Sequence, residues 1–100
     1  MPKHYFYVLF CADETLYAGY TVNLNRREQE HNMGAGAKYT SLVKRRPVKI
    51  IYSEEYVTRS AAMQREAAFK QLSRLEKIMF LQDHNINLPF VILSDMVKSQ

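Results

Sequence analysis

The sequence predicts an α+β domain in which a small three-stranded antiparallel sheet is flanked by helices, in the order β-β-α-β-α-α. Two short runs rich in aromatic residues lie near the N-terminus with only a few polar residues between them, which indicates an antiparallel hairpin. A third, β-branched run follows a basic loop. A chain of 100 residues with three glycines and three prolines fits one domain without long flexible linkers.

The first of the three strands is expected to be the central one. It is apolar throughout, as is typical of a strand buried on both faces, and it contains the single cysteine, Cys11, which we expect to be a buried core thiol. The three strands are expected at residues 5–11, 15–21 and 48–52, the last tailing off at 54–56.

Capping residues predict where the helices begin. Asn23 can cap a first helix, and Thr58 or Ser60 a second one. Ser73, with Glu76 three residues later, forms the capping box of a third helix. The helices are therefore expected from 24 to 32 or 33, where residues 34–36 end the first one, from about 59 to 72, and from 74 to 82.

The C-terminal stretch is assigned separately. Residues 1–82 are expected to form the domain, and residues 83–100 an extension that packs on it or serves for association. Pro89 bars a helix through that point, and residues 90–93 form a short apolar piece, either a strand or a tail on the core.

Charge and composition limit the class of protein. The net charge is +4 and the pI about 9.3, which favours polyanionic partners such as nucleic acid. A lone cysteine fits a reducing compartment, and neither a secretory signal nor an apolar run of about 20 residues is present, so we expect an intracellular protein that does not bind membranes. Zinc-ligand spacing, a glycine-rich phosphate loop and a nucleophile elbow are all absent from the sequence.

The first helix carries basic residues on its apolar face. Leu24, Arg27 and His31 share one face by their three-and-four spacing. Buried basic groups need an anionic partner. Either Arg27 pairs with a carboxylate while His31 caps the helix end, or the two form a phosphate clamp, for which a planar guanidinium is suited.

The second helix carries a carboxylate, Glu66, at the edge of its apolar face, beside Ala62, Met63 and Phe69. A carboxylate there should be paired, protonated or bound to metal. The two interpretations are a salt bridge to Lys70, four residues on, and a Mg²⁺ site completed by water and phosphate oxygens.

Two tyrosines have the same parity on the hairpin strands. Tyr7 and Tyr17 are therefore expected on one face as cross-strand neighbours. They either serve packing alone, or their hydroxyls orient a water at phosphorus and take its proton.

The loop before the third strand is basic, with no acidic residue between positions 37 and 49. It either contacts backbone phosphates through its cations and hydroxyls or is a solvated basic loop. The residues expected to bind nucleic acid are Lys38, Tyr39, Thr40, Lys44, Arg45 and Arg46.

Taken in order, these residues resemble the GIY-YIG nuclease family, in its small stand-alone branch. The resemblance covers roughly residues 4–80. The two half-motifs are similar to Tyr5-Phe6-Tyr7 followed by Val8-Leu9, and to Tyr17-Ala18-Gly19; Arg27, His31 and Glu66 follow in the family's order. In the first half-motif Tyr5 and Phe6 stand for glycine and isoleucine, and Ala18 stands for the second isoleucine. The asparagine that several members carry after the glutamate helix has no assigned counterpart, since Asn85 and Asn87 lie farther on.

The resemblance implies a role for each matched residue. Glu66 would be the ligand of one Mg²⁺ or Mn²⁺ ion, and Arg27 would steady phosphate charge. Tyr7 and Tyr17 would flank the attacking water, with His31 assisting as base or phosphate contact. Gly19 would allow close backbone approach beside the site.

The expected function is that of a metal-dependent endonuclease hydrolysing phosphodiester bonds in DNA, with structure-dependent or weakly sequence-specific cleavage; RNA is not excluded as substrate. The alternatives are a nucleic-acid-binding module of the same fold with little turnover, and a protein-interaction domain that uses residues 90–93 in a homodimer or with a protein partner.

Overall fold

The computed structural model describes residues 3–86 and residue 88. Three strands, β1 (His4–Cys11), β2 (Leu16–Thr21) and β3 (Val48–Tyr56), form one antiparallel sheet in the order β2-β1-β3. The central position of β1 explains its apolar sequence, because both of its faces are covered. Residues 87 and 89–100, which hold most of the expected C-terminal extension and its apolar piece at 90–93, lie outside the described part of the chain.

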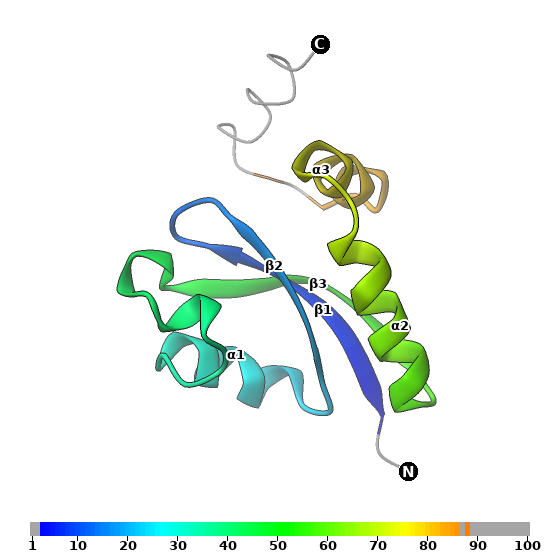
Figure 1. The fold of residues 1–100 in the computed structure, drawn as a ribbon, viewed down its shortest axis with the longest axis horizontal. Coiled ribbons are helices and arrows are strands. Elements are labelled where there is room, and N and C mark those ends of the chain that lie inside the picture. The colour runs from blue at the N-terminus through cyan, green and yellow to red at the C-terminus, as the bar shows by residue number, and fades with distance from the viewer. Residues whose placement is uncertain (1–2, 87, 89–100) are drawn as a thin grey trace.

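Helices cover both faces of the sheet (Figure 1). One face packs against α1 (Leu24–Asn32) and the segment that follows it, and the other against α2 (Arg59–Lys70) and α3 (Arg74–Asp83). The segment between α1 and β3 contains two short 3-10 helices, η1 (Tyr39–Ser41) and η2 (Val43–Arg45). The predicted α+β fold and its order of elements are confirmed.

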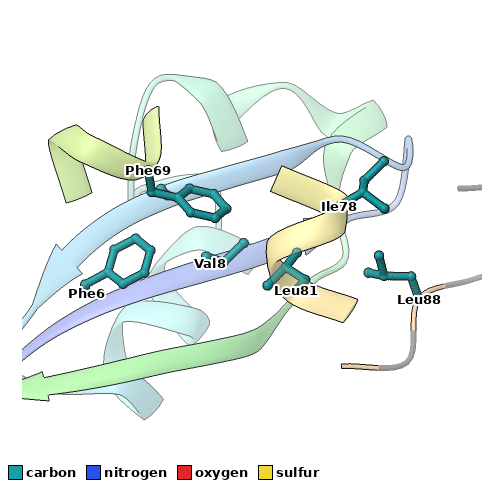
Figure 2. Close-up of a cluster of buried hydrophobic side chains, with 7 residues drawn as sticks. Phe6, Val8, Phe69, Ile78, Leu81 and Leu88 are labelled. Atoms are coloured by element: carbon teal, nitrogen blue, oxygen red, sulfur yellow. The ribbon is translucent and has the colours of Figure 1, made fainter. Parts of the chain in front are cut away.

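The larger core lies between the sheet and the two C-terminal helices. Phe6 and Val8 point from β1 toward Phe69 of α2 and toward α3 (Figure 2). Leu88 also belongs to this core, so the packed unit continues beyond the end of α3. A buried apolar side chain of this size contributes roughly 1.5–3 kcal/mol to folding.

A polar network holds α2 on β3 at the side of this core. Arg65 donates to both carboxylate oxygens of Glu54, at 2.8 and 3.4 Å. The hydroxyls of Tyr52 and Tyr56 donate to the same carboxylate. These donors lower the pKa of Glu54 in spite of its burial. The network is internally satisfied, and its role is structural.

The predicted boundaries hold at the helix starts and shift at some ends. Asn23 and Thr58 cap α1 and α2, and Ser73 with Glu76 forms the expected capping box. The second helix ends at Lys70, two residues before the predicted end. The third strand continues in full to Tyr56, because it pairs with β1 as far as His4.

In the register of the hairpin, Tyr7 and Tyr17 do not lie directly opposite each other. Tyr7 lies opposite Gly19, and Leu9 lies opposite Tyr17. Tyr7 and Tyr17 are therefore diagonal neighbours on the face that α1 covers, which is within reach of aromatic side chains.

Candidate active site

The site is built around a buried hydrogen-bonded series of three side chains. The hydroxyl of Tyr7 lies 2.7 Å from Nε2 of His31, and Nδ1 of His31 lies 2.7 Å from Oγ1 of Thr40. All three side chains are at most 1% exposed. They come from β1, α1 and η1, so the face of the sheet, the helix and the loop meet at His31.

Two glycines allow the loop after α1 to close on the histidine. Gly34 has φ +83°, a conformation that favours glycine and that turns the chain at the end of the helix. A Cβ on Gly36 would lie 2.7 Å from the ring of His31. The sequence predicted only that residues 34–36 end the helix. In the structure they also bring the backbone of the loop close to the ring of His31.

Tyr17 is held between the loop and the second helix. Its ring stacks on that of Tyr39 at 5.1 Å and meets the edge of His31 at 5.6 Å. The guanidinium of Arg45 lies 3.6 Å from the centre of the Tyr39 ring, and Arg45 pairs with Asp13 at 3.2 Å. This series of contacts ties the tip of the hairpin to the loop and fixes the position of Tyr17.

Arg27 lies on the same face of α1 as His31, as predicted, and it is partly exposed. Its Nε lies 3.1 Å from Glu30 Oε1, but this ion pair lacks hydrogen-bond geometry, and Nε is buried without a hydrogen-bond partner among the described residues. The guanidinium therefore keeps donor capacity that the fold does not use, which suits it to bind an anion.

Glu66 lies at the edge of the apolar face of α2, with its side chain 16% exposed. One carboxylate oxygen is 2.8 Å from Nζ of Lys70, as expected from the salt-bridge interpretation, which was one of the two. Lys70 Nζ also lies 5.4 Å from the centre of the Tyr17 ring. The sequence did not predict this contact, which links Glu66 through Lys70 to the tyrosines on the other side of the sheet edge.

The pKa of the Tyr7 hydroxyl is influenced by three of the other predicted catalytic residues. Burial raises the pKa of its hydroxyl far above the usual value, and Tyr17 and Glu66 raise it further. Arg27 opposes them, by its charge and as a weak donor outside strict hydrogen-bond geometry, and lowers the pKa of the same hydroxyl. Three of the other predicted catalytic residues, Tyr17, Arg27 and Glu66, thus lie within electrostatic range of Tyr7, and the fourth, His31, is bonded to it.

His31 is uncharged near neutral pH. Burial of the ring, reinforced by the charge of Arg27, lowers its pKa to about 4, and Glu30 opposes this shift. Its side chain makes both of its hydrogen bonds to Tyr7 and Thr40, so the histidine does not cap the helix with its ring.

Gly19 leaves room for the tyrosine hydroxyl. A Cβ at this position would fall on the hydroxyl end of Tyr7, the residue that lies opposite on β1. The absence of a side chain therefore keeps the space around the Tyr7 hydroxyl free, in accordance with the close approach that the resemblance implies.

The six loop residues expected to meet nucleic acid are divided by the structure. Lys38 and Lys44 are exposed. Arg46 instead donates to the carbonyls of Asn32 and Ser41, and the contacts of Tyr39 and Arg45 are within the fold. Thr40 is fully buried and lies beneath the loop surface rather than on it.

The donor set around Glu66 suits a hard cation with few protein ligands. No group of three or more histidine, cysteine, aspartate or glutamate side chains comes together within residues 3–86 and 88. A partly exposed single carboxylate fits Mg²⁺ or Mn²⁺, which retain several waters and take further oxygens from phosphate. Within the same residues, no helix is both long and apolar enough to cross a membrane.

Comparisons with known proteins identify the family of the chain. The sequence model of the GIY-YIG catalytic domain matches residues 3–79. A UPF0213 protein from Lactiplantibacillus plantarum is 50% identical over 88 residues, covering 88% of this chain and 87% of the relative. A UPF0213 protein from Enterococcus faecalis is 56% identical over 80 residues, covering 80% of this chain and 91% of the relative.

Two solution NMR structures share the fold. A protein from E. faecalis, 48% identical, superposes with a TM-score of 0.55 and covers 89% of this chain and 94% of its own. A UPF0213 protein from Bacillus halodurans, 35% identical, superposes with a TM-score of 0.52 and covers 80% and 83%. Because the domain model covers more than three quarters of its length and the two relatives match 88% and 80% of it, the chain belongs to the GIY-YIG nuclease-domain family.

Proposed function

We propose that this protein is a metal-dependent endonuclease that hydrolyses phosphodiester bonds in DNA, with structure-dependent or weakly sequence-specific cleavage. The observation that carries the proposal is the environment of one hydroxyl. Tyr7 is buried, hydrogen-bonded to His31, and lies in the electrostatic field of Glu66 and Arg27. This arrangement combines a proton acceptor, a carboxylate and a guanidinium with an unused Nε donor, and groups of these kinds serve in phosphodiester hydrolysis.

Glu66 would hold the ion. One Mg²⁺ or Mn²⁺, when bound there, supplies Lewis-acid polarisation of a phosphate oxygen and stabilisation of the leaving oxygen. Lys70 occupies the same carboxylate in the structure, so its ammonium would have to move aside for an ion to take that oxygen.

The chain's own residues would handle the phosphate and the proton. Arg27 has an unused Nε donor that can offset negative charge building up on the phosphate. The Tyr7 oxygen would accept a proton from the attacking water as its own proton passes to Nε2 of His31, which is uncharged and 2.7 Å away. Tyr17, stacked and fixed, would shape the position of that water.

The exposed cations of the loop would hold the nucleic-acid backbone. Lys38 and Lys44 lie on η1 and η2 or beside them, and the loop is tied to the site through Thr40 and Tyr39. Contacts of this kind are made to phosphate and carry no sequence information, in accordance with weak sequence preference.

The test is a cleavage assay on single-stranded, duplex, flapped and branched DNA, with matching RNA substrates. Each is incubated with Mg²⁺, with Mn²⁺ and with a chelator. We expect metal-dependent nicking of at least one DNA substrate and none with chelator. If every substrate remains intact while the protein still retards DNA in a gel, the chain is a binding module without turnover.

A matched pair of variants identifies the source of any cleavage. Glu66→Gln removes the proposed ligand, and Glu55→Gln removes an exposed carboxylate of β3 that pairs only with Lys3 among the described residues. Loss of cleavage in the first variant alone supports the proposal, and equal cleavage by both would point to a contaminating nuclease. A mass that depends on concentration, without cleavage or DNA binding, would favour the protein-interaction alternative.

A further inference from the structure

Thr40 is a buried polar residue with no part in the mechanism described so far. It is fully buried, and its hydroxyl has two partners, Nδ1 of His31 at 2.7 Å and the carbonyl of Ala37 at 3.3 Å. A hydroxyl has one proton to donate. The two contacts therefore determine which way the protons of the histidine point.

At the loop end of the series, the carbonyl of Ala37 can only accept. Thr40 satisfies it by donating its single proton, as the geometry indicates. The oxygen of Thr40 then faces Nδ1 of His31 with a lone pair, so that Nδ1 must carry the hydrogen of this 2.7 Å contact.

The other end of the series requires the same direction. An uncharged imidazole with its proton on Nδ1 has a bare Nε2, which can only accept, and the hydroxyl of Tyr7 donates to it at 2.7 Å. The positive charge of Arg27 acts on the same hydroxyl, which favours a tyrosine proton that points away from Arg27 and toward His31. In this assignment the Tyr7 hydroxyl donates to Nε2 of His31, Nδ1–H of His31 donates to Thr40, and the Thr40 hydroxyl donates to the Ala37 carbonyl.

We propose that Thr40 is a positioning residue that fixes His31 in the tautomer with its proton on Nδ1, which leaves Nε2 as the acceptor for the Tyr7 hydroxyl. The reverse assignment would leave the Ala37 carbonyl without the proton of Thr40 and the proton of the Tyr7 hydroxyl without its acceptor at Nε2. A backbone carbonyl often accepts the last hydrogen bond behind a functional histidine. Because a carbonyl can only accept, it fixes the direction of the hydrogen bonds that lead to it.

The catalytic consequence rests on the proposed function. In the hydrolysis, a proton of the attacking water would pass to the Tyr7 oxygen as the tyrosine proton moves to Nε2. The oxygen of that water would form the new bond to phosphorus as the bond to the leaving oxygen breaks. In the imidazolium so formed, the Nδ1–H group would still donate its hydrogen bond to the oxygen of Thr40, and this oxygen would stabilise the positive charge. Thr40 thereby also anchors the basic loop directly to His31.

The test reads the tautomer of His31 directly. Protein labelled with ¹⁵N-histidine is observed by long-range ¹H–¹⁵N correlation near pH 7, where coupling patterns separate the two tautomers. The native protein is expected to show the proton on Nδ1. Thr40→Val keeps the shape of the side chain without its hydroxyl and is expected to lose this preference, whereas Thr40→Ser keeps the hydroxyl and should retain it.

The outcomes separate this inference from the proposed function. A native protein with the His31 proton on Nε2, or a Thr40→Val variant that keeps the native tautomer, overturns the inference whether or not the protein cuts DNA. If Thr40→Val does not fold, the native spectrum with that of Thr40→Ser still decides the assignment. With an active protein, Thr40→Val should lower the cleavage rate roughly 10- to 100-fold, the usual cost of losing the partner that orients a functional histidine, with little change in DNA affinity.

Discussion

The hydroxyl of Tyr7 and Nε2 of His31 lie 2.7 Å apart in the interior of the protein, although 24 positions separate them in the sequence. The contact joins the central strand to the C-terminal end of α1. Both side chains are at most 1% exposed, so the bond exists without competition from bulk water.

Replacement of Tyr7 by phenylalanine should abolish most cleavage. The rate is expected to fall roughly 10²- to 10⁴-fold, the contribution typical of a positioned acid or base. Because Nε2 of His31 loses its buried partner, the free energy of unfolding should also fall, by about 1–3 kcal/mol. Single-turnover rates and urea denaturation measure the two effects. Tyr5→Phe, on the same face of β1, is the control and should change neither; a fully active Tyr7→Phe would remove Tyr7 from the mechanism.

The depressed pKa of His31 predicts a loss of stability in mild acid. The folded protein resists protonation of this ring until about pH 4, whereas the unfolded chain takes up the proton near 6.5. The unfolded state therefore binds more protons between these values, and the free energy of unfolding falls as the pH is lowered through that range. The total loss is on the order of 3 kcal/mol, from about 1.4 kcal/mol per unit of pKa.

Urea unfolding near pH 7 and near pH 5 measures the part of this loss that falls above pH 5, about 2 kcal/mol, with His31→Gln as the reference that lacks the titrating ring. We expect the native protein to lose more stability than the variant over this interval. Equal losses, or an NMR titration in which His31 protonates near its ordinary pKa, would contradict the buried, neutral state of the ring.

Lys70 should compete with metal for Glu66. Its ammonium lies 2.8 Å from the carboxylate, and removing it as Lys70→Gln should free that oxygen. A partly exposed charge pair of this kind is worth up to about 1 kcal/mol, so Mn²⁺ affinity should rise by up to roughly 5-fold. Titration of Mn²⁺ followed by electron paramagnetic resonance measures it, with Lys70→Arg as the variant that preserves the charge. Weaker binding by Lys70→Gln would mean that Lys70 assists the ion instead of competing with it.

The exposed lysines of the loop should set the salt dependence of DNA binding. Each phosphate contact that is lost reduces the slope of log affinity against log salt by about 0.9 on duplex DNA. The double variant Lys38→Gln, Lys44→Gln should therefore reduce the slope by roughly 2. The control Lys3→Gln, near the N-terminus and outside the loop, should leave the slope unchanged. An unaltered slope in the double variant would place the DNA elsewhere on the surface.

Much of the fold follows from local rules that the sequence displays. The capping residues Asn23, Thr58 and Ser73 begin the three helices where their side chains accept backbone protons. The apolar run of β1 predicts a central strand because it has no polar face to turn to solvent. The end of the third strand was harder to predict, because its pairing with β1, and not its local sequence, continues β3 to Tyr56.

The site was only partly predictable. The spacing of Arg27 and His31 on α1 indicated a polar cluster on an inward face, and both residues lie there. The spacing could not show that Thr40 turns inward to His31, because the loop reaches it through the left-handed backbone of Gly34 and the missing side chain of Gly36. Likewise, the contact of Lys70 with Tyr17 joins elements far apart in the sequence and depends on tertiary packing.

The most direct test of the central claim is the cleavage rate of Glu66→Gln beside the native protein and Glu55→Gln, under single-turnover conditions with saturating Mn²⁺. The variant keeps the size of the side chain and can still contact Lys70, so the fold should persist. We predict that Glu66→Gln loses at least about 10²-fold in rate, in keeping with a removed metal-dependent stabilisation of several kcal/mol, while Glu55→Gln cuts like the native protein. A folded Glu66→Gln that cuts as fast as the native protein would contradict the account.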